Sequence, residues 1–241
     1  MPARIRFQII PSPAPIDQPV TKFGGQPVWV AAPTWPLDPE TGEPMLFLAQ
    51  IALDGGLFPG ADGTVVYLFY SAAAEPLYGE AIAAVIQRGG QVFTSAAPEV
   101  SFVPQASGPA VFELDAARHQ VYREYQVIAE PATDEPSIPL TERYQLSDLD
   151  LGSGYLFSHP LLAGNKFGGQ PLYIEGLDTP PAPFTSDEWL LLMQLAPEQG
   201  YWAQEFQPNF YPFFLEMGEF GIMTVFIARD YTRVVCYTQQ P

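Results

Sequence analysis

The sequence predicts a mainly β protein in which two related halves, arising from an internal duplication, form one curled-sheet body, roll-like or sandwich-like, with few short helices. Three observations lead to this prediction. Proline accounts for 27 of the 241 residues, about twice its usual share, which excludes a bundle of long helices. Hydrophobic residues make up 47% of the chain, enough for a sizeable core and too many for a disordered protein. The third observation is a repeat.

The repeated motif is Lys-Phe-Gly-Gly-Gln-Pro, at residues 22–27 and again at 166–171. A Gln ends an apolar run 28 residues after the Lys in both copies. We therefore predict a single domain, 1–241, with halves of approximately 1–135 and 136–241. Glycine pairs allow a left-handed backbone and a close approach, which favours a fold-defining turn; an anion held by the Lys and the Gly amides stays the alternative. The residues assigned to the structural motif are Lys22, Gly24, Gly25, Gln50, Lys166, Gly168, Gly169 and Gln194.

Short runs rich in Val, Ile, Phe and Tyr, bounded by Gly, Pro or Asp, predict strands along the whole chain. The predicted strands are 5–10, 45–51, 65–70, 91–94, 111–114, 121–128, 189–195, 223–227 and 234–237. In 189–195 a capped helix is also compatible with the sequence, but the equivalent run at 45–51 follows a Pro where a helix would be under way, so both are assigned as strands.

Three further predictions concern individual segments. Residues 121–128 have no cleanly apolar face, which predicts an edge or solvent-facing strand. Residues 78–88 carry Ala81, Ile82, Val85 and Ile86 at helical spacing, with Gly89-Gly90 after them, and predict the one helix. Clusters of Pro, Gly, Asp and Thr predict loops at 11–20, 31–44, 53–63, 129–139 and 176–187.

The sequence also resembles a known family. Trp-Pro at 35–36, Gly-Glu-Pro-Met at 42–45 and Phe-Leu-Ala-Gln-Ile at 47–51 follow the first motif, and Leu-Leu-Met-Gln at 191–194 and Cys-Tyr at 236–237 follow the second. This pattern resembles the YwqG-like family, a bacterial family of unknown function. The resemblance covers most of the chain, least clearly 71–150, and implies large twisted sheets curled into a roll. It brings no established catalytic residues.

The charge limits the partners. With 27 acidic and 10 basic residues, the formal net charge is −17. Nucleic acids and anionic membranes are therefore poor partners, because both need clustered Lys and Arg. No signal peptide and no apolar run of about 18 residues is present in the sequence, so we expect a cytoplasmic protein. The single Cys236 and two His give no zinc ligand set, and we predict no catalytic residues, no metal and no cofactor.

These observations lead to the hypothesis of a non-enzymatic protein that binds a basic protein. Its concrete form is an immunity protein that occludes the active cleft of a basic bacterial toxin, plausibly a nuclease. Acids in the loops of both halves and acids among the late aromatic residues are the predicted contacts: Asp38, Glu40, Glu43, Asp187, Glu188, Tyr201, Trp202, Glu205, Tyr211 and Glu216. The alternative is a small-molecule or carbohydrate-binding module with a site between the halves, lined by Trp29, Trp35, Tyr173 or Trp202.

Overall fold

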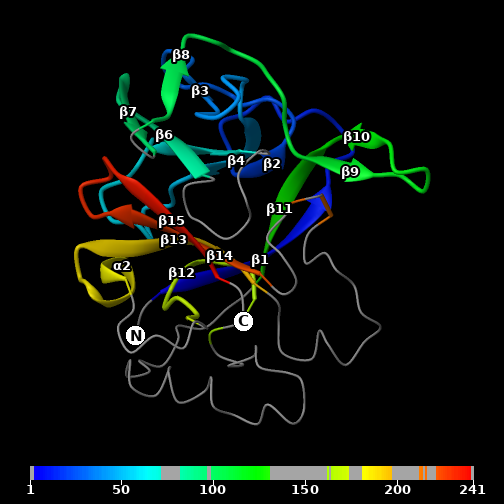
Figure 1. The fold of residues 1–241 in the computed structure, drawn as a ribbon. Helices are drawn as coiled ribbons and strands as arrows, with labels where there is room; N and C mark the ends of the chain where they lie inside the picture. The colour runs from blue at the N-terminus through cyan, green and yellow to red at the C-terminus, as the bar shows by residue number, and fades with distance from the viewer. Residues whose placement is uncertain are drawn as a thin grey trace.

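The computed structural model confirms a mainly β protein with one large curled sheet (Figure 1). It describes residues 3–71, 82–96, 99–130, 162, 164–173, 181–196, 212, 213, 215 and 221–239. Eleven strands form the main sheet in the order β15-β14-β13-β12-β1-β11-β2-β4-β5-β6-β7, and every pair in it is antiparallel.

The strands of the first half are β1 (Arg4–Pro11), β2 (Lys22–Gly24), β3 (Trp35–Leu37), β4 (Leu46–Ala52), β5 (Val65–Tyr70), β6 (Ile82–Arg88), β7 (Gln91–Ser95), β8 (Ser101–Val103), β9 (Phe112–Leu114), β10 (Gln120–Tyr122) and β11 (Glu124–Glu130). Those of the second half are β12 (Lys166–Gly168), β13 (Trp189–Leu195), β14 (Ile222–Ala228) and β15 (Val234–Gln239). One short helix, α2 (Ala182–Thr185), precedes β13. The strands predicted around 5–10, 45–51, 65–70, 91–94, 189–195, 223–227 and 234–237 are confirmed within one or two residues.

The centre of the sheet is the antiparallel pair β1 and β11, with Gln8 opposite Ile128. From this pair the strand order runs outward alike on both sides: β2, β4, β5 and β6 on one, β12, β13, β14 and β15 on the other. The two short motif strands flank the central pair. Strand β12 of the second half pairs with β1, and strand β2 of the first half pairs with β11. Both copies also carry a register irregularity at the same place, next to Leu48 and next to Leu192. A common origin of the halves stays a prediction.

The curl of the sheet brings its two end strands together. Ser95 of β7 donates its hydroxyl to the carbonyl oxygen of Val234 at 2.5 Å and accepts the Val234 N–H at 3.0 Å. Beside this contact, the Tyr231 hydroxyl donates to the carbonyl of Pro59 at 2.9 Å, and the Arg88 guanidinium lies 5.7 Å from the Tyr231 ring centroid. These side chains join edges that would otherwise be open to pairing with another chain.

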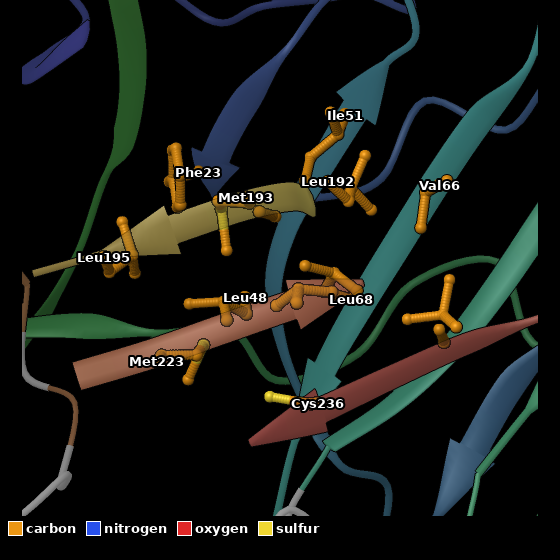
Figure 2. Packing of buried hydrophobic residues seen from close by; sticks show 14 of the residues in the cluster. Phe23, Leu48, Ile51, Val66, Leu68, Leu192, Met193, Leu195, Met223 and Cys236 are labelled. Carbon is orange, nitrogen blue, oxygen red and sulfur yellow. The ribbon is translucent and has the colours of Figure 1, made fainter. Parts of the chain in front are cut away.

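The largest core cluster draws side chains from both halves (Figure 2). Phe23, Leu48 and Leu68 from the first half pack with Leu192 and Met223 from the second. A second cluster around Trp35, Phe47 and Phe69 lies on β4, β5 and β6, and a third around Phe184, Leu191 and Phe226 lies on β13 and β14. Strands β4, β5, β6, β13 and β14, on either side of the central pair, are therefore apolar on both faces.

The predicted helix at 78–88 is wrong for its described part, because residues 82–88 form strand β6 between β5 and β7. Residues 82–87 are all buried. A strand buried on both faces needs no alternation of polar and apolar residues, so its apolar run also fits helical spacing. Gly89 and Gly90 do not end a helix: both have positive φ, 55° and 81°, and form the two-residue turn between Arg88 and Gln91.

The edge or solvent-facing strand predicted for 121–128 is confirmed for residues 121–122, where Tyr122 is 55% exposed, but the edge position is wrong for residues 124–128. The segment divides at Arg123 into β10, which pairs only with β9 in the described structure, and β11, which lies in the middle of the main sheet. Tyr125 of β11 is fully buried, whereas Gln126 and Val127 are only partly buried. The predicted loops 31–44 and 176–187 contain β3 and α2. The short strands β2, β8 and β12 were not predicted.

Candidate functional site

The first motif places a buried lysine beside a carboxylate. Lys22 of β2 is 0% exposed. Its Nζ donates to Glu124 Oε1 at 3.0 Å and to the carbonyl oxygen of Ile16 at 2.9 Å. The other Glu124 oxygen accepts the Ile16 N–H. This network fixes the chain before β2 onto β11, which gives Lys22 a structural part in the sheet.

The glycines of the motif allow a close crossing of two backbones. Gly24 has a φ of +62°, and a Cβ on it would lie 2.6 Å from the carbonyl oxygen of Arg123. Gly168 of the second motif has a φ of +68°, and a Cβ there would lie 2.7 Å from the carbonyl oxygen of Ala3. A side chain at either position meets backbone, which cannot move aside, so the fold requires glycine in both copies.

In the second copy, Lys166 is likewise 0% exposed, and its Nζ donates to the carbonyl oxygen of Gln170 at 2.6 Å. The residue opposite Gly168 in β1 is Arg4, whereas the residue opposite Gly24 in β11 is Glu124. The crossing strand thus places a basic residue opposite the first glycine of the second motif and an acidic residue opposite that of the first motif.

Gln50 and Gln194 complete both motifs. They pair in register with the motif lysines, Lys22 with Gln50 and Lys166 with Gln194. Both glutamines are 0% exposed. Their amide groups tie the segments on either side of the motif strand to the sheet, so they act as fold-defining residues.

Sequence reasoning missed a second pair of glutamines, Gln87 in β6 and Gln239 in β15. Gln87 Oε1 accepts the N–H groups of Val30 and Ala31 at 3.0 and 2.8 Å, and Gln239 Nε2 donates to the carbonyl oxygen of Leu172 at 3.2 Å. Each therefore holds the segment that follows a motif. Their offset is 152 residues rather than 144, so a search at constant spacing cannot find them.

The predicted partner residues differ in their surroundings. Asp38 is buried, and its carboxylate accepts the Glu40 and Thr41 N–H groups at 3.0 and 2.9 Å and the Ser71 hydroxyl. Burial works to raise the pKa of Asp38, but the hydrogen bonds from Ser71, Thr41 and Glu40 outweigh it and hold the pKa below its ordinary value. Asp38 thus stabilises its own loop.

The other described acids of the set face solvent. Glu40 and Glu43 are exposed beyond β3, and Asp187 and Glu188 are exposed between α2 and β13. Figure 1 shows β3 and α2 at different ends of the body. The two acidic loops therefore do not merge into one patch. Tyr201, Trp202, Glu205, Tyr211 and Glu216 lie outside the described residues.

A cavity of about 500 Å³ opens at the junction of β1, β4, β11 and β12. Most of its wall is apolar: Ile5, Ile16, Val20, Ile51, Ala52, Leu57, Phe58, Val127, Ala129 and Phe167. Its polar lining residues are Thr21, Asp54 and Gln126. The volume lies within the range of small-molecule sites. Phe167 comes from the second half, whereas the other described lining residues come from the first half.

The hydrogen bonds of Thr21 and Asp54 are partly used within the protein. Thr21 Oγ1 accepts the Ala52 N–H at 3.1 Å. Asp54 Oδ1 accepts the N–H groups of Gly56 and Leu57 at 2.8 and 3.3 Å, which turns the loop after β4. The described part of the chain gives Asp54 Oδ2 and the Gln126 side chain no hydrogen bond.

A second cavity, of about 470 Å³, lies between Leu57 and Phe58 of the first half and the second motif. Gly168, Gln170, Asp187, Trp189 and Arg229 belong to its more polar wall. Arg229 Nε donates to the carbonyl oxygen of Asp187. Because Leu57 and Phe58 line both cavities, this loop separates two hollows at the seam of the halves.

The aromatic residues expected at a site between the halves lie elsewhere. Trp35 and Tyr173 are buried at 0% and 4% exposure, and Trp29 packs on Tyr67 with ring centroids 4.5 Å apart. None of these three lines either cavity. Trp202 lies outside the described residues.

Among the residues that the structure describes, no three His, Cys, Asp or Glu residues come together as a metal site. No helix within them is long and apolar enough to cross a membrane. Burial raises the pKa of the Cys236 thiol, so it is a poor nucleophile.

The fold and the motif contacts together define a mainly β protein with a single curled sheet. Its two motif copies lie on either side of the central strand pair, and its main core cluster contains side chains from both halves. A family described as a domain of unknown function (DUF1963) matches residues 21–231. The chain belongs to this family. Searches of curated proteins and of solved structures gave no significant match.

Proposed function

We propose that this protein is a non-enzymatic binding protein that captures a basic protein partner, in the concrete form of an immunity protein against a basic bacterial toxin. The observation that carries the proposal is the net charge of −17. The resemblance of its motifs to YwqG-like proteins supports a bacterial setting by analogy only.

The structure adds a second support, since both lysines of the chain are buried at 0% exposure. Of the eight arginines, Arg123 pairs with Glu113 at 3.1 Å, and Arg233 lies 5.2 Å from the Trp189 ring centroid. The two lysines therefore leave the exposed acids uncompensated, and Arg123 is paired with an acid. A large charge of one sign speeds association with an oppositely charged protein.

The mechanism would be occlusion. Glu40, Glu43, Asp187 and Glu188 would face the basic cleft of the toxin and take the place of the phosphates of its substrate. Because the two acidic loops lie at different ends of the body, only one of them would contact the cleft. The other would add to the long-range electrostatic attraction between the two proteins.

The test is capture from the lysate of the source cell at low and at high salt, with identification of the bound proteins. We expect one basic protein that is lost at high salt, because salt screens exposed charges beyond about 8–10 Å. Kinetics with the isolated partner should then show slower association for Glu40→Lys/Glu43→Lys or for Asp187→Lys/Glu188→Lys than for the control Glu99→Lys. A salt-independent association rate would contradict the electrostatic mechanism.

A second candidate function is a small-molecule-binding module, and the two cavities at the seam favour it. Since Trp29, Trp35 and Tyr173 do not line them, a carbohydrate lacks these stacking partners. The apolar cavity suits a hydrophobic molecule instead. Binding of such a molecule to the intact protein, and its loss when the cavity is filled by a larger side chain, is the test.

A further inference from the structure

The apolar cavity at the junction of β1, β4, β11 and β12 has a chemical preference that can be argued from its wall. Of the thirteen lining residues that the structure describes, ten are apolar, so hydrocarbon would remove most of a bound molecule from water. Phe58 and Ile51 belong at the same time to the main core cluster. The cavity is thus a hollow that adjoins the core and opens to solvent, where Val20, Asp54 and Ala129 are exposed.

One lining residue carries a charge. Asp54 stands in the loop after β4, and the bonds from Gly56 and Leu57 hold Oδ1 in place. Within the described structure Oδ2 receives no hydrogen bond. None of the described lining residues is a Lys or an Arg. An anionic guest would meet this carboxylate and the net charge of −17 without a counter-charge, whereas an ammonium group would form a charge-assisted hydrogen bond to Oδ2.

We infer that this cavity binds a hydrophobic amine: a molecule with an apolar body in the cavity and a single ammonium group at Asp54. This inference rests on the small-molecule function proposed for the cavity and is independent of the basic protein partner.

The test compares three probes of one chain length, decylamine, decan-1-ol and decanoate, by isothermal titration calorimetry with the full chain at pH 7. We expect one decylamine per chain, bound at least about tenfold more tightly than decan-1-ol, the increment of one charge-assisted hydrogen bond. Decanoate should bind most weakly. Asp54→Asn should reduce the affinity for decylamine to that for decan-1-ol.

Two matched controls separate site binding from general attraction to an acidic protein. Glu43→Gln removes one exposed charge far from the lining residues and should leave the decylamine affinity within about twofold. Ala129→Phe fills the cavity from an exposed position and should abolish binding of all three probes. Ile128→Phe, on the opposite face of the same strand and 43% exposed, should leave binding intact. Unfolding by urea checks that each variant folds.

The outcomes are distinct. If decylamine and decan-1-ol bind equally and both are lost in Ala129→Phe, the cavity is a small-molecule site but the amine preference is wrong. If no probe binds, or if Ala129→Phe leaves binding unchanged, both the preference and the small-molecule function of this cavity are overturned.

Discussion

Gln50 and Gln194, 144 residues apart, make the same three hydrogen bonds to equivalent partners. Gln50 Oε1 accepts the Val28 N–H at 2.8 Å, and its Nε2 donates to the carbonyl oxygens of Gln18 and Val20 at 3.2 and 2.7 Å. Gln194 accepts the Leu172 N–H at 2.8 Å and donates to Leu162 and Gly164 at 2.8 and 3.0 Å. Adding 144 to each partner of Gln50 gives the corresponding partner of Gln194.

The first prediction concerns these side chains. Gln194→Ala should lower the free energy of unfolding by roughly 3 kcal/mol, because three buried backbone groups lose their partner, and Gln50→Ala should lower it by a smaller amount, roughly 2 kcal/mol, because its three partners are only partly buried. Gln91→Ala, at an exposed position of β7, should change it by less than about 0.5 kcal/mol. Urea denaturation measures all three. Equal effects of Gln50→Ala and Gln91→Ala would show that the amide network does not stabilise the fold.

The second prediction concerns the buried ion pair. The Lys22 side chain is 1% exposed and that of Glu124 is 20% exposed. Lys22→Met should therefore destabilise by about 3 kcal/mol, the lower part of the range for breaking a buried pair. The double variant Lys22→Met/Glu124→Gln should recover part of the loss. Arg123→Met removes the more exposed pair with Glu113 and should cost at most about 1 kcal/mol. If Lys22→Met costs no more than Arg123→Met, the pair is not a stabilising element.

The third prediction concerns acid. The pKa of Asp38 is lowered in the fold from an ordinary value of 3.8. A lowered pKa contributes stability that is fully present above the ordinary value and is lost as the pH falls through the folded value. The stability of the protein should thus fall below about pH 4, and Asp38→Asn should weaken this dependence while lowering stability at pH 7 by about 2 kcal/mol. Urea unfolding between pH 7 and pH 3 measures both, with Glu43→Gln as the control. An unchanged slope in Asp38→Asn would refute the assignment.

The sequence was sufficient to predict those parts of the fold that leave a local or repeated pattern. The motif copies, their Lys-to-Gln spacing and most strands of the main sheet follow from identities and from β-branched runs bounded by turn residues. The pairing of β1 with β11 does not follow, because these partners lie about 120 residues apart and share no motif. For the same reason the central position of β11 could not be distinguished from an edge.

The candidate site was less predictable than the fold. The sequence does not distinguish an acidic loop residue that faces solvent, such as Glu43, from one that stabilises its own turn, such as Asp38. Aromatic residues near the motif were expected in a cleft, yet Trp35 donates its ring N–H to the Met45 carbonyl inside the core. The described lining of the cavity comes from β1, the chain before β2, β4 and the loop after it, β11 and Phe167 of β12, which come together only through the curl of the sheet.

The fourth prediction tests that curl. Ser95 is the side chain through which β7 meets the start of β15, by one bond donated and one accepted. Ser95→Ala leaves the N–H and the carbonyl of Val234 without this partner and should lower stability by about 1–2 kcal/mol. Thr94→Ala, on the exposed face of the same strand, is the matched control. Amide hydrogen exchange should locate the loss: protection should fall at Val234 and along β7 and β15 while β1 and β11 keep theirs. Uniform loss across the sheet, or none in β15, would show that the sheet is closed by its core packing and not by this contact.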